Sequence, residues 1–247
     1  MSTKFTFAAA TIAAALVLAP LAAQGPDAKK AADGAKAATG AWTPLFDGKS
    51  LAGWRGYKKE NATETRWKVD NGTLTLPADD GKDTRGARDI ITVGTYDNFD
   101  LRWEWKAAQG ANSGVKYFVL EDQPAAIGHE YQLIDDAKHP DAKIGPHRQT
   151  AAFYDVLPAT NRPSKPAGEW NTSRVVVRGK DVEHWLNGTK VLSYTLDSRA
   201  LREAVAKSKF KDVERFGKPQ NGLILLQDHG DAVCYRNVKV RALPAKS

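Results

Sequence analysis

Apolar and polar residues alternate with a period of two over much of the chain after residue 42. In residues 99–106 every odd position is aromatic or leucine and every even position is charged. Such alternation is typical of a strand with one buried face and one solvated face. The runs 66–76 and 182–192 are each centred on an Asn-Gly pair, a strong hairpin signal. We therefore predict an all-β protein in which many short strands form a sandwich of two antiparallel sheets.

One stretch departs from this alternation. Residues 197–210 are rich in good helix formers, and Leu201 and Val205 are spaced to share one face. Asp197 or Ser198 can cap the N-terminus of a helix there. We predict one short helix inserted between two strands.

The first residues are typical of an export signal. A lysine at position 4 precedes the almost unbroken apolar stretch 5–19, and small residues follow at a cleavage-like position. The stretch is shorter than the ~20 apolar residues that a membrane span needs. We predict a secretory signal peptide over 1–23, a flexible linker over 24–41 and a single folded domain over 42–247. The mature protein is expected to be soluble, without a lipid anchor, in the periplasm or outside the cell.

Composition narrows the class of partner. The net charge of +7 is spread along the chain, with lysines and arginines interspersed among acidic residues. Zinc-finger spacing, a Walker loop and a dinucleotide-binding glycine motif are all missing from the sequence, so we predict no nucleic-acid partner. The single cysteine, Cys234, excludes an intramolecular disulfide.

Six sequence blocks resemble one known family. They are LFDGKSLAGW at 45–54, NSGV at 112–115, EYQLIDD at 130–136, GEWN at 168–171, LQDHG at 226–230 and YRNVKV at 235–240. Their order and content are similar to those of the 3-keto-disaccharide hydrolase family, and they extend over nearly all of the chain after residue 42. The resemblance implies a concanavalin-A-like jelly roll with a sugar site on its concave face. It also implies cleavage of glycosides whose C3 hydroxyl has been oxidised to a ketone, by hydrolysis or as a lyase. Residues 151–154, Ala-Ala-Phe-Tyr, depart from the common family pattern.

A 3-keto group makes elimination an accessible route. The ketone acidifies the hydrogen on C2, a base removes it, and the C1 substituent leaves across the C1–C2 bond. Addition of water to the resulting enone completes a net hydrolysis. The route needs a base active near neutral pH, a donor at the C3 oxygen and an acid for the leaving oxygen. It needs no covalent nucleophile, in keeping with a sequence that has no nucleophile elbow.

Glu130 and His229 are the candidate catalytic residues. On a strand Glu130 and Gln132 point to the same side, which places a carboxylate beside an amide. His229 lies in a polar turn, and histidine is the usual proton shuttle at neutral pH. The alternatives are a solvated outer-face glutamate and a turn histidine that binds a backbone carbonyl.

Several further side chains are candidates for substrate or metal binding. The substrate-binding candidates are Asn112, Lys116, Gln132, Tyr154, Gln227 and Asp228. Asp135, His139 and His147 lie in a polar loop that could bind a divalent metal ion, although their spacing matches no established metal motif. A solvated loop is the alternative, and we assign no other cofactor.

Two other functions fit the same fold. A non-catalytic carbohydrate-binding module would need only aromatic and amide side chains, and a fold does not fix function. A conventional glycosidase would need two carboxylates facing each other across a cleft, ~5–5.5 Å apart for retention or ~6.5–9.5 Å for inversion. Glu130 has no evident carboxylate partner in the sequence, which favours the keto-sugar reading.

Overall fold

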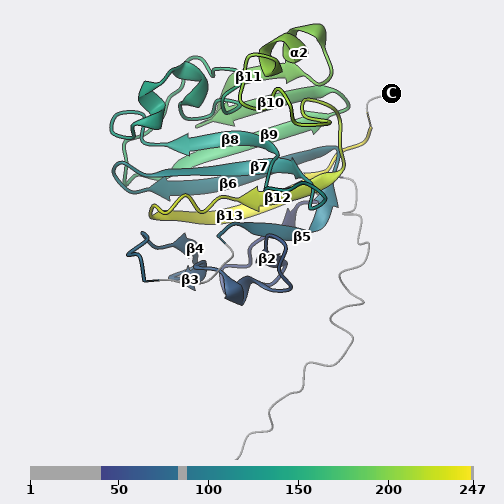
Figure 1. Ribbon diagram of the computed structural model, residues 1–247. Coiled ribbons are helices and arrows are strands. Elements are labelled where there is room, and N and C mark those ends of the chain that lie inside the picture. Colours follow the sequence, from purple (N-terminus) through teal and green to yellow (C-terminus); the bar gives the residue numbers. More distant parts are fainter. Residues whose placement is uncertain (1–39, 83–87, 246–247) are drawn as a thin grey trace, which may run out of the picture. The chain divides into compact units, whose positions relative to one another are not determined.

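The computed structural model describes residues 40–82 and 88–245 (Figure 1). The predicted signal peptide, 1–23, lies outside these residues, as does nearly all of the predicted linker, 24–41. No helix in the described part is long and apolar enough to cross a membrane.

Two antiparallel sheets make up the described part. The larger sheet has the order β11 (Thr189–Thr195), β10 (Asp181–Leu186), β9 (Asn171–Arg178), β6 (Phe99–Ala107), β13 (Val233–Ala242), β4 (Thr73–Leu76) and β3 (Lys68–Asp70), and β1 (Thr43–Pro44) pairs with β13. The smaller sheet has the order β2 (Trp54–Gly56), β5 (Ile90–Tyr96), β12 (Gly222–Leu226), β7 (Asn112–Val119) and β8 (His129–Ile134). In Figure 1, β7, β8 and β12 lie in front of β6, β9 and β13.

The core lies between the sheets and follows the alternation of the sequence. The odd residues of β6 are buried, and Trp103 packs edge-on against Tyr131 of β8 with ring centroids 5.0 Å apart. The two Asn-Gly pairs turn the hairpins β3–β4 and β10–β11 as predicted. Within residues 40–82 and 88–245, this arrangement confirms the predicted all-β jelly-roll sandwich with one short α-helix.

The helix is shorter than predicted. α2 occupies Arg199–Val205, and the Ser198 side chain caps it by accepting the Leu201 N–H. The prediction extended to residue 210, but the Lys209 N–H binds the Asp155 carboxylate at 2.8 Å, so the chain leaves the helical path. A tertiary contact therefore overrides helix propensity here.

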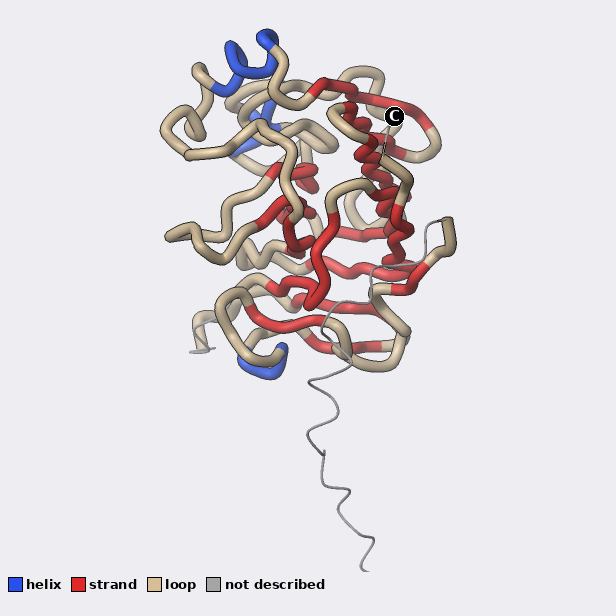
Figure 2. Tube along the Cα trace, turned by 90° about the vertical axis from the view of Figure 1, so that its right-hand side faces the viewer, coloured by secondary structure: helices blue, strands red, loops and turns tan. Residues whose placement is uncertain are grey.

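Irregular segments border β8, the edge strand of the smaller sheet, where Ala151 and Ala152 exchange backbone hydrogen bonds with Gln132. Residues 135–157 contain the short 3₁₀ turns η2 (Asp141–Lys143) and η3 (Pro146–Arg148), and residues 206–221 follow α2. A third 3₁₀ turn, η1 (Ala62–Glu64), follows β2. Figure 2 shows these helical turns at the ends of the described part, with the strands between them.

Candidate functional site

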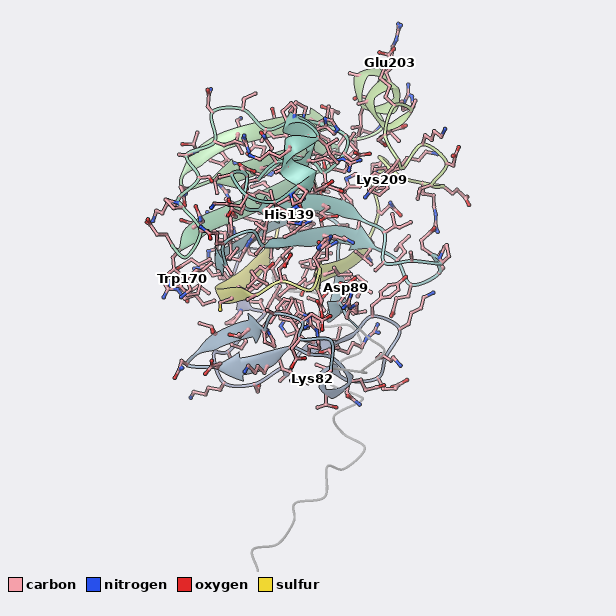
Figure 3. The ribbon with its side chains drawn as sticks, turned by 60° about the vertical axis from the view of Figure 1, so that its left-hand side comes forward. Lys82, Asp89, His139, Trp170, Glu203 and Lys209 are labelled. Carbon is pink, nitrogen blue, oxygen red and sulfur yellow. The ribbon has the colours of Figure 1, made fainter. Side chains whose placement is uncertain are left out.

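A polar cavity of about 390 Å³ opens on the outward face of the smaller sheet. Its walls come from β7, β8, the end of β12 and the two irregular segments. In Figure 3, Lys209 and Asp89 lie above and below the central strands of this face, with His139 beside them. The side chains that carry its chemistry are Asp89, Asn112, Lys116, Glu130, Gln132, Tyr154, Lys209, Gln227 and His229. The structure thus brings together both predicted catalytic residues and five of the predicted substrate-binding residues.

The register of β7 and β8 places the carboxyl group. Lys116 pairs with Glu130, and Gly114 pairs with Gln132, so these positions share the outward face. A Cβ atom on Gly114 would lie only 2.3 Å from Oε1 of Glu130. The Glu130 side chain thus occupies the space beside Gly114. Only glycine leaves room for the carboxyl group at this position.

Glu130 is a buried acid between two amines. It is 5% exposed, and the Lys116 Nζ lies 3.9 Å from its Oε2. Burial raises the pKa of the Glu130 carboxyl, and the charges of Lys116 and Lys209 oppose this shift only in part. A carboxyl group tuned upward in this way is suited to proton transfer near neutral pH.

Asp89 supplies a second carboxyl group that the sequence did not reveal. It immediately precedes β5 and accepts the backbone N–H of Asp228 at 2.9 Å. Desolvation raises the pKa of Asp89, and the charge of Lys116 lowers it. No motif or alternation marks this residue in the sequence; only the tertiary structure places it in the cavity.

Three amide oxygens in the cavity wall have no hydrogen-bond partner among the described residues. They are Oδ1 of Asn112, Oε1 of Gln132 and Oε1 of Gln227, and all three atoms are buried. The Nε2 of Gln132 donates to the Arg148 carbonyl at 3.4 Å. This bond fixes the orientation of the amide, so the atom without a partner is the acceptor Oε1. Buried acceptors without partners are costly, so the site is suited to a ligand with several hydroxyl donors.

Lys209 and Tyr154 close one side of the cavity. The Lys209 Nζ lies 4.2 Å from the centroid of the Tyr154 ring, and the Tyr154 hydroxyl donates to Asp141 at 2.8 Å. Desolvation lowers the pKa of Lys209, whereas the nearby charge of Glu130 raises it. The sequence analysis missed Lys209 because it placed this position in the predicted helix 197–210.

His229 lies at the rim. Its side chain is 45% exposed, and its Nδ1 is 3.7 Å from the Asp231 carboxylate. The centroids of the His139 and His229 rings are 5.7 Å apart. A nitrogen of each ring and a carboxylate oxygen of Asp231 lie within 4.8 Å of one another, close enough to be considered as ligands of one metal ion. The Nδ1 of His139 accepts the Asp141 N–H at 3.1 Å, so the neutral ring carries its proton on Nε2. A metal at this cluster would therefore require that hydrogen bond to break.

The other two metal candidates have different partners. The Asp135 carboxylate accepts the Gly110 N–H at 2.8 Å and the Ala137 N–H at 3.0 Å. His147 lies 3.7 Å from Asp155. The structure therefore gives Asp135, His139 and His147 separate contacts and does not gather them around one point.

Asp228 is the one substrate-binding candidate that does not line the cavity. Its buried carboxylate pairs with Arg66 through contacts of 3.0 and 2.5 Å, and it also accepts the Gly230 N–H at 2.9 Å. These bonds hold the turn that carries His229. Neighbouring residues of a turn point in different directions, which sequence spacing alone does not resolve.

A chain of hydrogen bonds in the core lies beneath the cavity. Because the Gly217 N–H donates to Nε2 of His129, the proton of this ring is on Nδ1 and is donated to the Tyr194 oxygen. Tyr194 then donates to Tyr117, which donates to Nε2 of His184. At the far end the Nδ1–H of His184 donates to the Ala151 carbonyl at 2.9 Å.

This chain leaves both histidines neutral and joins both irregular segments to the sheets. Burial lowers the pKa of His129 to about 3 and that of His184 to about 4. One end of the chain holds Gly217, in the segment of Lys209, and the other holds Ala151, in the segment of Tyr154. Every polar group along it is satisfied, so it fixes the two segments that complete the cavity.

Comparison with known proteins identifies the family of this chain. Residues 41–241 match the family profile described as a 3-keto-alpha-glucoside-1,2-lyase-like domain. This chain belongs to that family. A relative from Bacteroides thetaiotaomicron named 3-keto-disaccharide hydrolase is 34% identical over 225 residues, which cover 81% of this chain and 77% of the relative.

Two crystal structures of Parabacteroides distasonis proteins, provisionally described as glycosyl hydrolases, are also similar. One has a TM-score of 0.73 at 30% identity and covers 90% of this chain and 99% of the other. The second has a TM-score of 0.61 at 28% identity and covers 82% of this chain and all of the other. Both likenesses extend over most of the sandwich.

Three of the six sequence blocks that carry the family resemblance meet at the cavity. The NSGV block provides Asn112, the EYQLIDD block provides Glu130 and Gln132, and the LQDHG block provides Gln227 and His229. The first two of these blocks lie on the neighbouring strands β7 and β8, and the lining residues of the third come directly after β12. In this member of the 3-keto-alpha-glucoside-1,2-lyase-like family, the shared motifs therefore build one pocket.

Proposed function

We propose that this protein cleaves the glycosidic bond of 3-keto-glycosides by removal of the C2 hydrogen and elimination of the C1 substituent. The observation that carries the proposal is the buried carboxyl group of Glu130, flanked by amines and surrounded by unpaired amide acceptors in a sugar-sized cavity. Membership of the 3-keto-alpha-glucoside-1,2-lyase-like family and the name of the B. thetaiotaomicron relative support the choice of substrate.

Each step has a side chain suited to it. The Glu130 carboxylate takes the C2 proton, and the ammonium groups of Lys116 and Lys209 stabilise negative charge on the C3 oxygen. The C1–O bond breaks as the C1–C2 double bond forms, and His229 at the rim donates a proton to the leaving oxygen.

The unpaired amide oxygens accept sugar hydroxyls and orient the ring. Water then adds to C1 and a proton returns to C2, which gives the free 3-keto sugar. Release before this addition gives the enone and makes the protein a lyase. On the evidence of its N-terminal sequence, we propose that it acts after export.

Asp89 favours one second candidate function. Because the cavity contains two carboxyl groups, Asp89 and Glu130, conventional acid–base hydrolysis of an unoxidised glycoside has the residue types that it needs. The aromatic lining consists of Tyr154 and Phe210 among the described residues, which gives little support to a binding module that relies on stacking.

A pair of substrates separates these functions. The purified protein is incubated with a 3-keto-glucoside and with its unoxidised parent in ¹⁸O-labelled water, and products are identified by mass spectrometry. We expect cleavage of the keto form alone. Cleavage of the parent at a comparable rate would instead establish a conventional glycosidase, and binding of either sugar without cleavage would establish a binding module.

A further inference from the structure

A row of cations crosses the outward face of the larger sheet, opposite the face that packs on the core. Lys239 of β13 pairs with Arg102 of β6, and Arg102 pairs with Arg174 of β9. Arg174 then pairs with Trp185 of β10, which pairs with Lys190 of β11. Residues paired across neighbouring strands point to the same face, and the strands lie about 4.8 Å apart. The row therefore contains four cations and one tryptophan on five adjacent strands. Its acidic neighbours lie in other rows: Asp100 is beside the arginines, and Oε1 of Glu183 lies 3.1 Å from the Lys190 Nζ.

This register is unfavourable for the fold by itself. Like charges directly opposite each other on neighbouring strands destabilise a sheet. The fully buried carboxylate of Asp100, in the next row, accepts hydrogen bonds from Arg174 at 2.7 and 2.9 Å and from Arg241 at 2.8 and 3.1 Å, and contacts Arg102 at 3.4 Å. Burial alone would raise the pKa of Asp100, but the bonds from Arg174 and Arg102 lower it, so it stays ionised. One carboxylate among three guanidinium groups leaves an excess of positive charge.

Tryptophan rings hold these cations in place. Arg102 lies 4.7 Å and Lys239 5.2 Å from the centroid of the Trp42 ring, and Arg174 lies 5.3 Å from that of Trp185. Cation–π contacts and the bonds to Asp100 restrict the arginines, so little conformational entropy remains to be lost when an anion binds. The same contacts cover both rings, which are thus poorly placed to stack on a sugar or a nucleobase.

We propose that this row binds a linear acidic polysaccharide that carries one carboxylate per sugar ring, a polyuronate. The spacing of the strands is close to the length of one pyranose ring, so successive carboxylates can meet successive cations. Arginine guanidinium groups recognise carboxylates through paired N–H donors. The row lies on the larger sheet and the cavity on the smaller one, so this surface is independent of the proposed catalytic function.

A single-stranded nucleic acid is the other linear polyanion to consider. Proteins that bind single strands combine a basic groove with aromatic rings open to base stacking. Since Trp42 and Trp185 are both covered by cations, the row offers charge without that stacking surface. The chemistry therefore favours the polyuronate.

Binding of polygalacturonate to the whole protein tests the proposal. The test variant is Lys239→Gln with Lys190→Gln, because neither lysine bonds to Asp100 and the arginine cluster stays intact. Lys190 pairs with Glu183 at 3.1 Å, but an ion pair this exposed contributes little to stability. The matched control is Lys211→Gln with Lys218→Gln, which removes the same charge from exposed lysines of the segment after α2. Affinity is measured by calorimetry at several salt concentrations, with dextran as the neutral polysaccharide and oligo(dT) as the competing polyanion.

We expect the wild type and the control to bind polygalacturonate in a salt-dependent way, and the test variant to bind about tenfold more weakly. Dextran should not bind. Equal affinity in the test variant and the control, or no binding by the wild type, would overturn the proposal. Tighter binding of oligo(dT), with the same loss in the test variant, would reassign the row to nucleic acid. Cleavage rates should be equal in all three proteins, so failure here is distinct from failure of the proposed function.

Discussion

At the scale of single residues, the proposed elimination depends on one buried carboxyl group. Glu130 was recognisable from the sequence because it shares a strand face with Gln132 and lies in a family block. The burial of Glu130 and its two neighbouring amines could not be recognised from the sequence. One of these amines, Lys209, comes from a segment 79 positions away that we had predicted to be helical. Spacing predicts which side chains share an element, whereas contacts between elements depend on the whole fold.

Replacement of this carboxyl group should abolish most activity. Glu130→Gln keeps the shape of the side chain but removes the base, so we expect kcat on a 3-keto-glucoside to fall about a thousandfold. Glu203→Gln on α2 (labelled in Figure 3) removes an exposed acid and should leave kcat unchanged. Steady-state kinetics with both variants checks this. A Glu130→Gln enzyme of near-wild-type rate would remove Glu130 from the mechanism.

The role of His229 can be separated by the leaving group. If His229 protonates the departing oxygen, His229→Ala should slow the release of an alkyl alcohol about a hundredfold. Release of nitrophenolate, which needs no proton, should change much less. The rates of release of the alkyl alcohol and of nitrophenolate are measured in the variant and in the wild type. Equal losses of rate for both substrates would argue against proton donation by His229.

Gly114 is expected to be as sensitive as a catalytic residue. In Gly114→Ala the new Cβ would meet the Glu130 carboxyl at 2.3 Å, so the carboxyl group must move. A displacement of this size should lower kcat/KM about a hundredfold while the fold is retained. Gly94→Ala on β5, whose nearest contact would be 3.5 Å, serves as the control. Circular dichroism and kinetics of both variants decide the point.

At the scale of elements, the sequence predicted the strands but not the irregular segments beside the smaller sheet. The alternation in 99–106 and the two Asn-Gly pairs predicted β6 and two hairpins because local propensity, turn chemistry and burial agree there. The irregular segments follow tertiary contacts instead. Asp155 shortens α2 through its bond to Lys209, and the Arg66 guanidinium turns Asp228 away from the cavity.

The hydrogen-bond chain between these segments predicts a pH dependence of stability. His129 and His184 are neutral in the fold, with pKa values of about 3 and about 4, but take up protons below about 6.5 when unfolded. The contribution of these histidines to the free energy of unfolding is therefore complete above pH 6.5. It is lost as the pH falls toward 4, by up to about 1.4 kcal/mol per pH unit for each histidine.

Urea unfolding between pH 7 and pH 4.5 measures this loss. Glu130 has the opposite sign, since its raised pKa adds stability as the pH falls, so the comparison is made in the Glu130→Gln background. Adding His184→Gln should reduce the number of protons taken up on unfolding by about one, so the free energy of unfolding should change less steeply with pH. An unchanged dependence in that double variant would show that His184 is not held neutral.

At the scale of the whole molecule, the sandwich has two outward faces with different chemistry. The smaller sheet bears the cavity, which segments 135–157 and 206–221 line on one side, and the larger sheet bears the row of cations. The sequence showed a net charge of +7 spread along the chain, but the register of the strands gathers part of it into one line. Charge that is dispersed in sequence can thus be concentrated in space.

The fate of the C2 hydrogen distinguishes elimination from direct hydrolysis of the glycosidic bond. A 3-keto-glucoside labelled with deuterium at C2 is cleaved in ordinary water, with a sample lacking enzyme to correct for spontaneous exchange. We predict that the product loses its deuterium and that the wild-type enzyme shows a primary isotope effect on kcat/KM. Cleavage that retains the C2 deuterium, without an isotope effect, would contradict elimination initiated by Glu130.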